Sequence, residues 1–489
     1  MPVVSRRQFL SALGLLFARP GRCRGSQTAW PRPVTLNVVA DGYHGIWYAN
    51  QPVPGSYRYK YSGGMATYTA KHRPFAVFAP EVRRTFFCYG AAPRNNPRRL
   101  LHAVGCFDHD SRTLFLPTLV VDKQTNDAHD NPVISLDADG HIWLFSTSHG
   151  QARPSFIHRS TKPFRTDEFE PVAATIETSD GKIVPFDNFS YGQIWYVNGA
   201  GFAFFFTWYG APAARTLMFA CSEDGVRWRN LCRLATIEEG HYQVSGVWIP
   251  PAGSSAPPIL GTCFNYHPHR LGLNYRSNLY YVESRDFGRS WQTVCGKPVS
   301  LPLQQPDNEA LVLETRSEAR NVYLKDLAYD RVGRPVLLFV TSRGWRPGPE
   351  DGPRLWQIAN WTGASWKVET VCESDNAYDM GTLRHASDGS WQLFAPVLPG
   401  PQRFNPGGEV AMLEQSPGTG KWRVKCAVTR GSVYNHNYVR RPFHYAPEFV
   451  ALWSDGHGRH PSPVRLYMAD SHGIPYKLPV RMNGPVRLE

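Results

Sequence analysis

Residues 126–150 read NDAHDNPVISLDADGHIWLFSTSHG. The apolar segments 133–136 and 141–145 predict two strands joined by a turn rich in Asp and Gly. An antiparallel hairpin brings its outer ends together, so we expect His129 and His149 at one rim of a sheet. Two imidazoles beside hydroxyls and carboxylates suit proton transfer near neutral pH. The structural alternative is that His129 caps a turn and His149 binds a loop carbonyl.

Short apolar or alternating runs recur along the rest of the chain and are separated by turns at close intervals. Examples are residues 85–89, 113–121, 202–208, 336–341 and 448–453. Convincing helical periodicity is missing. This pattern predicts an all-β fold.

Two related turn motifs point to repeated blades. Residues 284–291, SRDFGRSW, match the Asp-box pattern Ser-x-Asp-x-Gly-x-x-Trp, and residues 222–228 are a version one residue shorter. Asp224 and Asp286 are 62 positions apart, which suits a large four-stranded propeller blade. The sequence therefore predicts a β-propeller with about seven blades. The boxes themselves shape turns, and we assign no chemistry to them.

The chain has 489 residues and a formal net charge of +13. Five arginines and no acidic residue lie in the first 25 positions, which leaves an excess of +8 beyond them. A basic balance favours an anionic partner, and we find no nucleic-acid-binding motif. An acidic polysaccharide fits better, while the alternative is a basic surface kept for solubility. The nine cysteines lack a CxxC pattern, so neither a zinc ribbon nor a disulfide framework is predicted.

The N-terminus resembles a twin-arginine export signal. Residues 5–10 read SRRQFL, and an apolar run follows to Ala18. We assign residues 1–30 to this signal and residues 31–489 to a single catalytic propeller, which would be monomeric and periplasmic or secreted. The alternative is an uncleaved anchor, although the run is short for a membrane span. No later segment reaches the roughly 18 apolar residues of a transmembrane helix.

Several other loops carry residues that could join the histidines at a propeller mouth. The candidates are Tyr191, Arg215, Tyr242, His267 and Arg276. Structural alternatives are a core position for Tyr191 and, for the loop 264–276, a metal clip through His267 and His269 or a solvated surface.

The residue types available favour one class of reaction. Phosphate-binding loops, GxSxG elbows and HExxH motifs are not found in the sequence. Hydrolytic glycosidases usually need two carboxylates across the scissile bond. A β-elimination at a uronate needs a group that neutralises the carboxylate, a base for the C5 proton and an acid for the leaving oxygen. Arg, His and Tyr can fill these three roles.

Five segments resemble the BNR-4 repeat family, which is similar to seven-bladed propeller polysaccharide lyases such as ulvan lyases and rhamnosyl-glucuronate lyases. They are residues 41–48, 59–64, 71–75, 127–132 and 146–150, and the resemblance extends over about residues 36–460. Residues 127–132 and 146–150 are its most specific part.

The resemblance implies specific roles. His129 would be the general base or acid, His149 would bind or neutralise the uronate carboxylate, and Tyr191 would be the partner acid or base. Arg215 or Arg276 would be the neutralising cation. Apart from the resemblance, we expect Asn131, Tyr242, His267 and Arg276 to bind substrate. Catalysis would need no cofactor, although some family members carry structural calcium or zinc.

We therefore expect a lyase that cleaves a uronate-containing polysaccharide, with sulfated or rhamnose-containing polymers among the candidates. One alternative is a sialidase-like glycoside hydrolase, because Asp boxes also occur in sialidases. Another is a propeller that binds glycans without catalysis.

Overall fold

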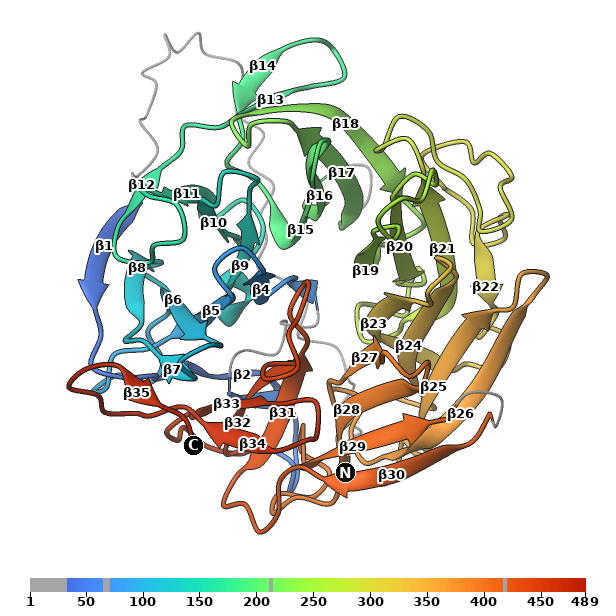
Figure 1. Ribbon diagram of the computed structural model, residues 1–489. Helices are drawn as coiled ribbons and strands as arrows, with labels where there is room; N and C mark the ends of the chain where they lie inside the picture. The colour runs from blue at the N-terminus through green and yellow to red at the C-terminus, as the bar shows by residue number, and fades with distance from the viewer. Residues whose placement is uncertain (1–32, 65–70, 211–213, 417–419) are drawn as a thin grey trace, which may run out of the picture. The chain divides into compact units, whose positions relative to one another are not determined.

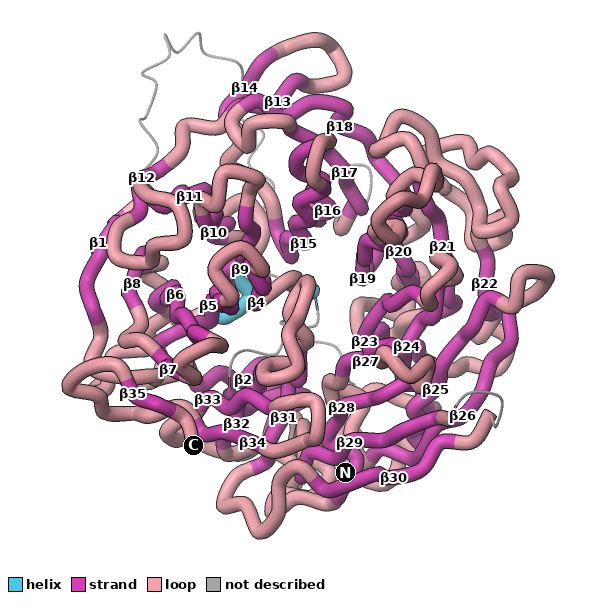
Figure 2. Tube along the Cα trace, viewed as in Figure 1, coloured by secondary structure: helices cyan, strands magenta, loops and turns pink. Residues whose placement is uncertain are grey.

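Antiparallel strands make up nearly all of the regular structure, apart from short 3₁₀ turns such as Ala128–Asp130 (Figure 2). A computed structural model describes residues 33–64, 71–210, 214–416 and 420–489. The predicted export signal lies outside the described residues. Pro33–Glu489 forms one compact unit. The strands of this unit are arranged as a β-propeller, which confirms the predicted fold class (Figure 1).

Six sheets contain four consecutive antiparallel strands each, with the first strand innermost (Figure 1). The first three are β9 (Pro132–Leu136), β10 (Ile142–Ser146), β11 (Phe156–Ser160) and β12 (Phe169–Pro171); β15 (Ser190–Val197), β16 (Gly201–Trp208), β17 (Thr216–Ser222) and β18 (Arg227–Ala235); and β19 (His241–Trp248), β20 (Ile259–Tyr266), β21 (Ser277–Ser284) and β22 (Leu311–Leu313). β13 (Thr175–Glu177) and β14 (Ile183–Pro185) extend the outer edge at β18.

The other three regular blades follow along the chain. They are β23 (Asn321–Tyr329), β24 (Pro335–Ser342), β25 (Arg354–Trp361) and β26 (Trp366–Ser374); β27 (Thr382–His385), β28 (Trp391–Leu398), β29 (Glu409–Gln415) and β30 (Trp422–Ala427); and β31 (Asn435–Arg440), β32 (Ala451–Gly456), β33 (Leu466–Ala469) and β34 (Pro475–Lys477). A separate hairpin consists of β2 (Trp47–Pro52) and β3 (Tyr59–Gly64).

The remaining sheet has a different construction. It contains β1 (Val34–Val39), β4 (Ala76–Ala79), β5 (Arg84–Ala91), β6 (Leu101–Asp108), β7 (Thr113–Leu114), β8 (Thr118–Asp122) and β35 (Val486–Arg487). Its order is β1-β8-β6-β5-β4, and β7 joins β6 to the C-terminal β35. The prediction of about seven blades is therefore corrected to six blades, accompanied by one composite sheet. The spacing of the Asp boxes predicts blades made of consecutive strands, so it could not predict a sheet that combines β1 with β35.

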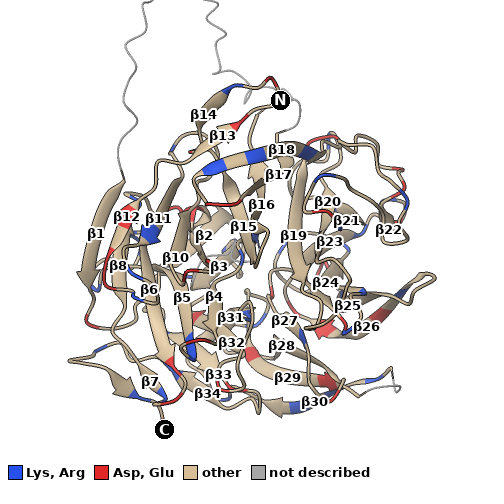
Figure 3. Cartoon of the chain, turned by 45° about the horizontal axis from the view of Figure 1, so that its top comes forward, with Lys and Arg blue, Asp and Glu red and all other residues tan. Residues whose placement is uncertain are grey.

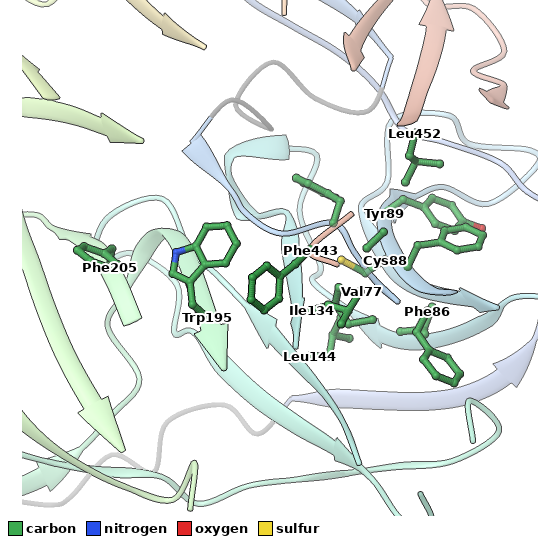
Figure 4. Close-up of a cluster of buried hydrophobic side chains, with 14 of the residues drawn as sticks. Val77, Phe86, Cys88, Tyr89, Ile134, Leu144, Trp195, Phe205, Phe443 and Leu452 are labelled. Atoms are coloured by element: carbon green, nitrogen blue, oxygen red, sulfur yellow. The ribbon is translucent and has the colours of Figure 1, made fainter. Parts of the chain in front are cut away.

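A large apolar core packs the composite sheet against its neighbours (Figure 4). Ile134 and Leu144 of the β9–β10 hairpin join Trp195 and Phe205 of the next blade in this cluster. Phe443, which follows β31, donates its backbone amide to the carbonyl of Ala76 in β4 at 2.7 Å. The last regular blade thus contacts the composite sheet, and burial of these aromatic and branched side chains favours the closed ring.

The two Asp boxes form the turns that the sequence predicts. Asp286 accepts hydrogen bonds from the Ser284 hydroxyl at 2.8 Å and the Ser290 amide at 2.9 Å. Gly288 has φ +86°, and a Cβ there would lie 2.1 Å from the Phe219 ring, so the glycine is needed for both reasons. These boxes follow β17 and β21 and serve as turns.

Charged residues are distributed along many strands and loops of the propeller, with a basic band on the outer strand β18 (Figure 3). Part of this band is neutralised, because Arg227 pairs with Asp224 and Arg229 with Glu223. In the described ranges, no helix is both long enough and apolar enough to cross a bilayer. The eight cysteines of these ranges are all free thiols.

Candidate active site

The β9–β10 hairpin brings its two histidines together as predicted. Ser146 pairs with Pro132 at the open end, and the imidazoles of His129 and His149 stack with centroids 4.0 Å apart and planes at 15°. The carboxylate of Asp127 bridges them. Its Oδ2 lies 3.0 Å from His149 Nδ1, and its Oδ1 forms a very short hydrogen bond with His129 Nδ1.

Asp127 is fixed by more than the two rings. It caps the turn Ala128–Asp130, because its side chain accepts from the backbone amide of His129 at 3.1 Å. Arg153 donates to Asp127 Oδ2 at 3.1 Å and to Asp130 Oδ2 at 2.7 Å. Burial opposes ionisation of Asp127, but hydrogen bonds from His129 and His149 outweigh it and hold the pKa of this carboxyl well below its usual range. A carboxylate anion therefore orients both imidazoles.

The two histidines differ in exposure. The side chain of His149 is 29% exposed, whereas that of His129 is 3% exposed. Burial lowers the pKa of His129, and the hydrogen bond with Asp127 acts in the opposite direction. Tyr48 OH lies 3.0 Å from His129 Nδ1, and Tyr61 OH lies 3.4 Å from His129 Nε2. His129 is thus enclosed by hydroxyls, and His149 is the ring of the pair that reaches solvent.

Tyr191 lies beside the histidine pair at the start of β15. Its ring centroid is 6.2 Å from both His129 and His149. Tyr209 OH donates to Tyr191 OH at 2.9 Å, and Arg215 Nε donates to Tyr209 OH at 3.2 Å. The donors are therefore arranged in series toward the Tyr191 oxygen, which favours negative charge on that oxygen. Burial raises the pKa of Tyr209, and Arg215 opposes this rise.

The predicted binding residues continue from Arg215 into the next blades. The Arg276 guanidinium lies 4.7 Å from the Tyr242 ring, 4.6 Å from the Tyr323 ring and 5.2 Å from the Tyr378 ring. The Arg215 guanidinium also lies 5.4 Å from the Tyr242 ring, so both cations contact this tyrosine. Cations held against aromatic faces keep their charge with little direct neutralisation.

His267 and Asn131, which are predicted to bind substrate, are buried like Tyr191 and Arg276. His267 is fully buried, with Nδ1 2.7 Å from the carbonyl oxygen of Tyr275 and its ring 5.1 Å from that of Tyr242. Asn131 is also fully buried, and its backbone carbonyl accepts a hydrogen bond from the Thr147 hydroxyl at 2.9 Å. The binding role of both residues stays a prediction.

Several neighbouring side chains are not among the site residues that the sequence predicts. They are Tyr48, Lys60, Tyr61, Arg153 and Tyr378. Lys60 is buried, its ammonium contacts Asn274 Oδ1, and it donates to Gln51 Oε1 at 3.1 Å. Burial lowers the pKa of Lys60 well below its usual value, and Arg276 and Arg215 lower it further. Tyr48, Lys60 and Tyr61 belong to segments that carried the family resemblance, which was the available signal for them.

One group of described residues has the donor atoms for a metal ion. Ligand atoms of Asp127, His129 and His149 lie within 4.8 Å of one another. Imidazole and carboxylate donors suit zinc. However, Arg153 already occupies Asp127 Oδ2, and a second cation at the same oxygen would be repelled. The contacts therefore favour a hydrogen-bonded His–Asp–His group over a metal centre.

Comparisons with known proteins agree with this architecture. The sequence profile of the BNR repeat-containing family matches residues 107–374, more than half of the chain. An ulvan lyase structure, bound to -[GlcA(1-4)Rha3S]-, has a TM-score of 0.64 and 13% sequence identity, over 90% of this chain and 96% of that chain. The polysaccharide lyase Uly1 has a TM-score of 0.56 and 11% identity, over 90% and 98% of the two chains. No curated protein sequence matches the chain. At these identities the structural likeness shows a shared fold.

Proposed function

The chain belongs to the BNR repeat-containing family, and on this premise we propose that it is an exported lyase that cleaves a uronate-containing polysaccharide by β-elimination. The observation that carries the proposal is the meeting of a carboxylate-bridged histidine pair, a tyrosine and an arginine at one rim. The structural neighbours add support, because two of them are polysaccharide lyases and one is bound to a glucuronate-containing sugar.

The reaction needs two proton transfers. The C5 proton of the uronate moves to an enzyme base, its electron pair forms the C4–C5 double bond, and the C4–O4 bond breaks. The departing O4 takes a proton from an enzyme acid, which leaves an unsaturated uronate on one fragment and a hydroxyl on the other. Neutralising the carboxylate lowers the cost of the negative charge that develops when C5 loses its proton.

The contacts suggest how the residues share these roles. Tyr191 would accept the C5 proton, because Arg215 acts through Tyr209 to favour negative charge on its oxygen. His149 would contact the sugar, where it can protonate O4 or bind the carboxylate, since it is the more exposed imidazole. His129, which the sequence resemblance makes the base or acid, would orient His149 through their shared carboxylate. Arg215 and Arg276 would attract the anionic sugar.

A panel of uronate polysaccharides that includes ulvan tests this proposal directly. A lyase produces an unsaturated uronate that absorbs in the ultraviolet as chains are cut. New reducing ends without that absorbance would instead indicate a hydrolase, and retention of polymer without products would indicate a binding propeller. Either outcome would contradict the elimination reaction.

We also propose that catalysis is independent of a metal ion. Arg153 neutralises the carboxylate that a metal would need, so extensive treatment with a chelator should leave turnover within about twofold of the untreated value. A large loss of turnover that zinc or calcium restores would contradict this.

Export to the periplasm or medium would be tested by fractionating cells that express the full chain and a variant with Arg6 and Arg7 replaced by lysine.

A further inference from the structure

A polar groove adjoins the candidate active site on the side of the composite sheet. Its volume is about 760 Å³, within the roughly 300–1,000 Å³ that is typical of ligand sites. The lining residues are Asn96, Arg98, Arg99, Gln124, Thr125 and Asn126. They come from the loop between β5 and β6 and from the segment that leads from β8 to the histidine hairpin.

The lining residues of the groove are linked to the histidine group through the chain and through packing. Asn126 directly precedes Asp127, the carboxylate that bridges His129 and His149. Ala128 packs with Leu100, which closes the loop that carries Arg98 and Arg99, and Tyr48 packs against the same cluster. The backbone amide of Leu100 donates to the carbonyl of Thr125 at 2.8 Å. The two walls are therefore bonded to each other and to the active-site turn.

The walls are shaped before any ligand binds. Gln124 has φ +55°, a left-handed conformation that a residue with a side chain rarely adopts. The backbone amide of Gln124 donates to Asp122 Oδ1 at 2.9 Å, which holds this conformation. On the other wall, Asn96 Oδ1 accepts from the amide of Arg98 at 3.2 Å. Rigid walls reduce the entropy that is lost when a ligand binds.

The lining suits an anionic sugar chain. It offers two guanidinium groups, three side-chain amides and a hydroxyl, and it includes no acidic residue. Arg99 is paired with Asp122, whereas no carboxylate among the described residues lies within ion-pair distance of the exposed Arg98. Amides and hydroxyls bind sugar hydroxyls, and guanidinium groups bind carboxylates or sulfates.

We propose that this groove is an outer subsite that binds sugar residues beyond the cleaved bond, so that the protein acts on long anionic chains within their length. The proposal rests on the proposed lyase function and adds the preferred length of the substrate. We expect an anionic chain bound at the histidines to extend toward the groove, because Asn126, which lines the groove, directly precedes Asp127.

Charge reversal at Arg98 tests this subsite against a matched control. Arg289 is also an exposed arginine, but it follows β21 in an Asp-box turn, at the opposite end of the strands from the active site. For ulvan polymer, Arg98→Glu should raise KM about five- to tenfold with kcat nearly unchanged, because a cation contact is replaced by repulsion. For the shortest ulvan oligosaccharide that the wild type cleaves, Arg98→Glu should change KM less than it does for polymer, because fewer sugar residues extend beyond the cleaved bond toward the groove. Arg289→Glu should resemble the wild type on both substrates.

A binding measurement separates failure of the subsite from failure of the lyase function. Binding of fluorescently labelled ulvan polymer is followed by anisotropy for the wild type, Arg98→Glu and Arg289→Glu. Binding that Arg98→Glu weakens, without any turnover by the wild type, would contradict the lyase function and support the groove. Equal binding by all three proteins, or no binding by any of them, would overturn the groove.

Discussion

Two stacked histidine pairs lie on the same rim of the propeller, and their surroundings differ. His129 and His149 flank the start of β9, with centroids 4.0 Å apart. His457 and His460 follow β32, whose last residue pairs with the first residue of β31, and their centroids are 3.6 Å apart. Ring stacking alone therefore does not distinguish the two pairs.

The carboxylate makes the difference. Asp127 bonds to both rings of the first pair, and Tyr191 lies beside them. In the second pair, His457 Nδ1 accepts from the backbone amide of Arg459 at 3.0 Å, and burial lowers its pKa. A fixed charge orients both rings of the first pair, whereas a backbone turn holds His457 in the second. Chemistry at a histidine pair is thus read from its hydrogen-bond partners.

The largest expected effect follows from removing one hydroxyl beside the first pair. Tyr191→Phe should lower kcat on a uronate polysaccharide by about 10²- to 10⁴-fold, the usual contribution of a general base or acid. The ring remains, so the loss of the Tyr209 hydrogen bond should cost about 1 kcal/mol of stability. Ultraviolet assays and thermal unfolding measure the two effects. Turnover within a few-fold of the wild type would exclude Tyr191 as the base.

A buried histidine whose partners are backbone groups should make the stability of the protein depend on pH. His241 Nε2 accepts from the Ile237 amide at 2.7 Å, and Nδ1 lies 2.8 Å from the carbonyl oxygen of Asn265, so the ring must be neutral. Burial lowers its pKa from 6.5 to about 4, although the Asn265 carbonyl opposes this. The unfolded chain then binds more protons between these values, and the free energy of unfolding falls as pH drops through this window.

The loss should reach about 3 kcal/mol near pH 4 for this group. Denaturant titrations of the wild type and His241→Gln between pH 7 and 4 measure it. The glutamine variant should show a shallower dependence on pH, whatever its stability at pH 7. Parallel curves for the two proteins would show that His241 does not titrate as expected.

Removing the bridging charge should have a smaller effect. Asp127→Asn keeps the size of the side chain but loses the anion that orients both rings, so kcat should fall about 10- to 100-fold. Asp127 raises the pKa of His129, so its loss should lower that pKa and move any limb of the pH–rate profile due to His129 to lower pH. An unchanged profile with full activity would place the histidine pair outside the reaction.

The smallest effect is expected at the second pair. His457→Ala should leave kcat unchanged and alter stability by no more than about 0.5 kcal/mol, because its ring is held by a backbone turn. The contact of its backbone carbonyl with Trp47 survives the substitution. A large loss of turnover would show that stacking without a carboxylate suffices, and the distinction between the pairs would fail.

The sequence predicted the features that local chemistry controls. The hairpin that joins His129 to His149 followed from a turn of Asp and Gly between apolar segments, and the Asp boxes followed from their spacing. The sequence does not predict roles for Tyr48 and Tyr61, because these residues precede His129 by 81 and 68 positions and belong to a different hairpin. Their approach depends on closure of the ring, which leaves no periodic signal in the sequence.

The pairing of β35 with β7 has a consequence for the order of folding. These two strands are far apart along the chain, because β35 is Val486–Arg487 and β7 is Thr113–Leu114. Each of the six regular blades can form from its own consecutive strands, but the composite sheet also needs β35. A chain shortened by its final four residues would have no Val486–Arg487 strand for β7, and we expect its composite sheet to lose hydrogen-exchange protection first.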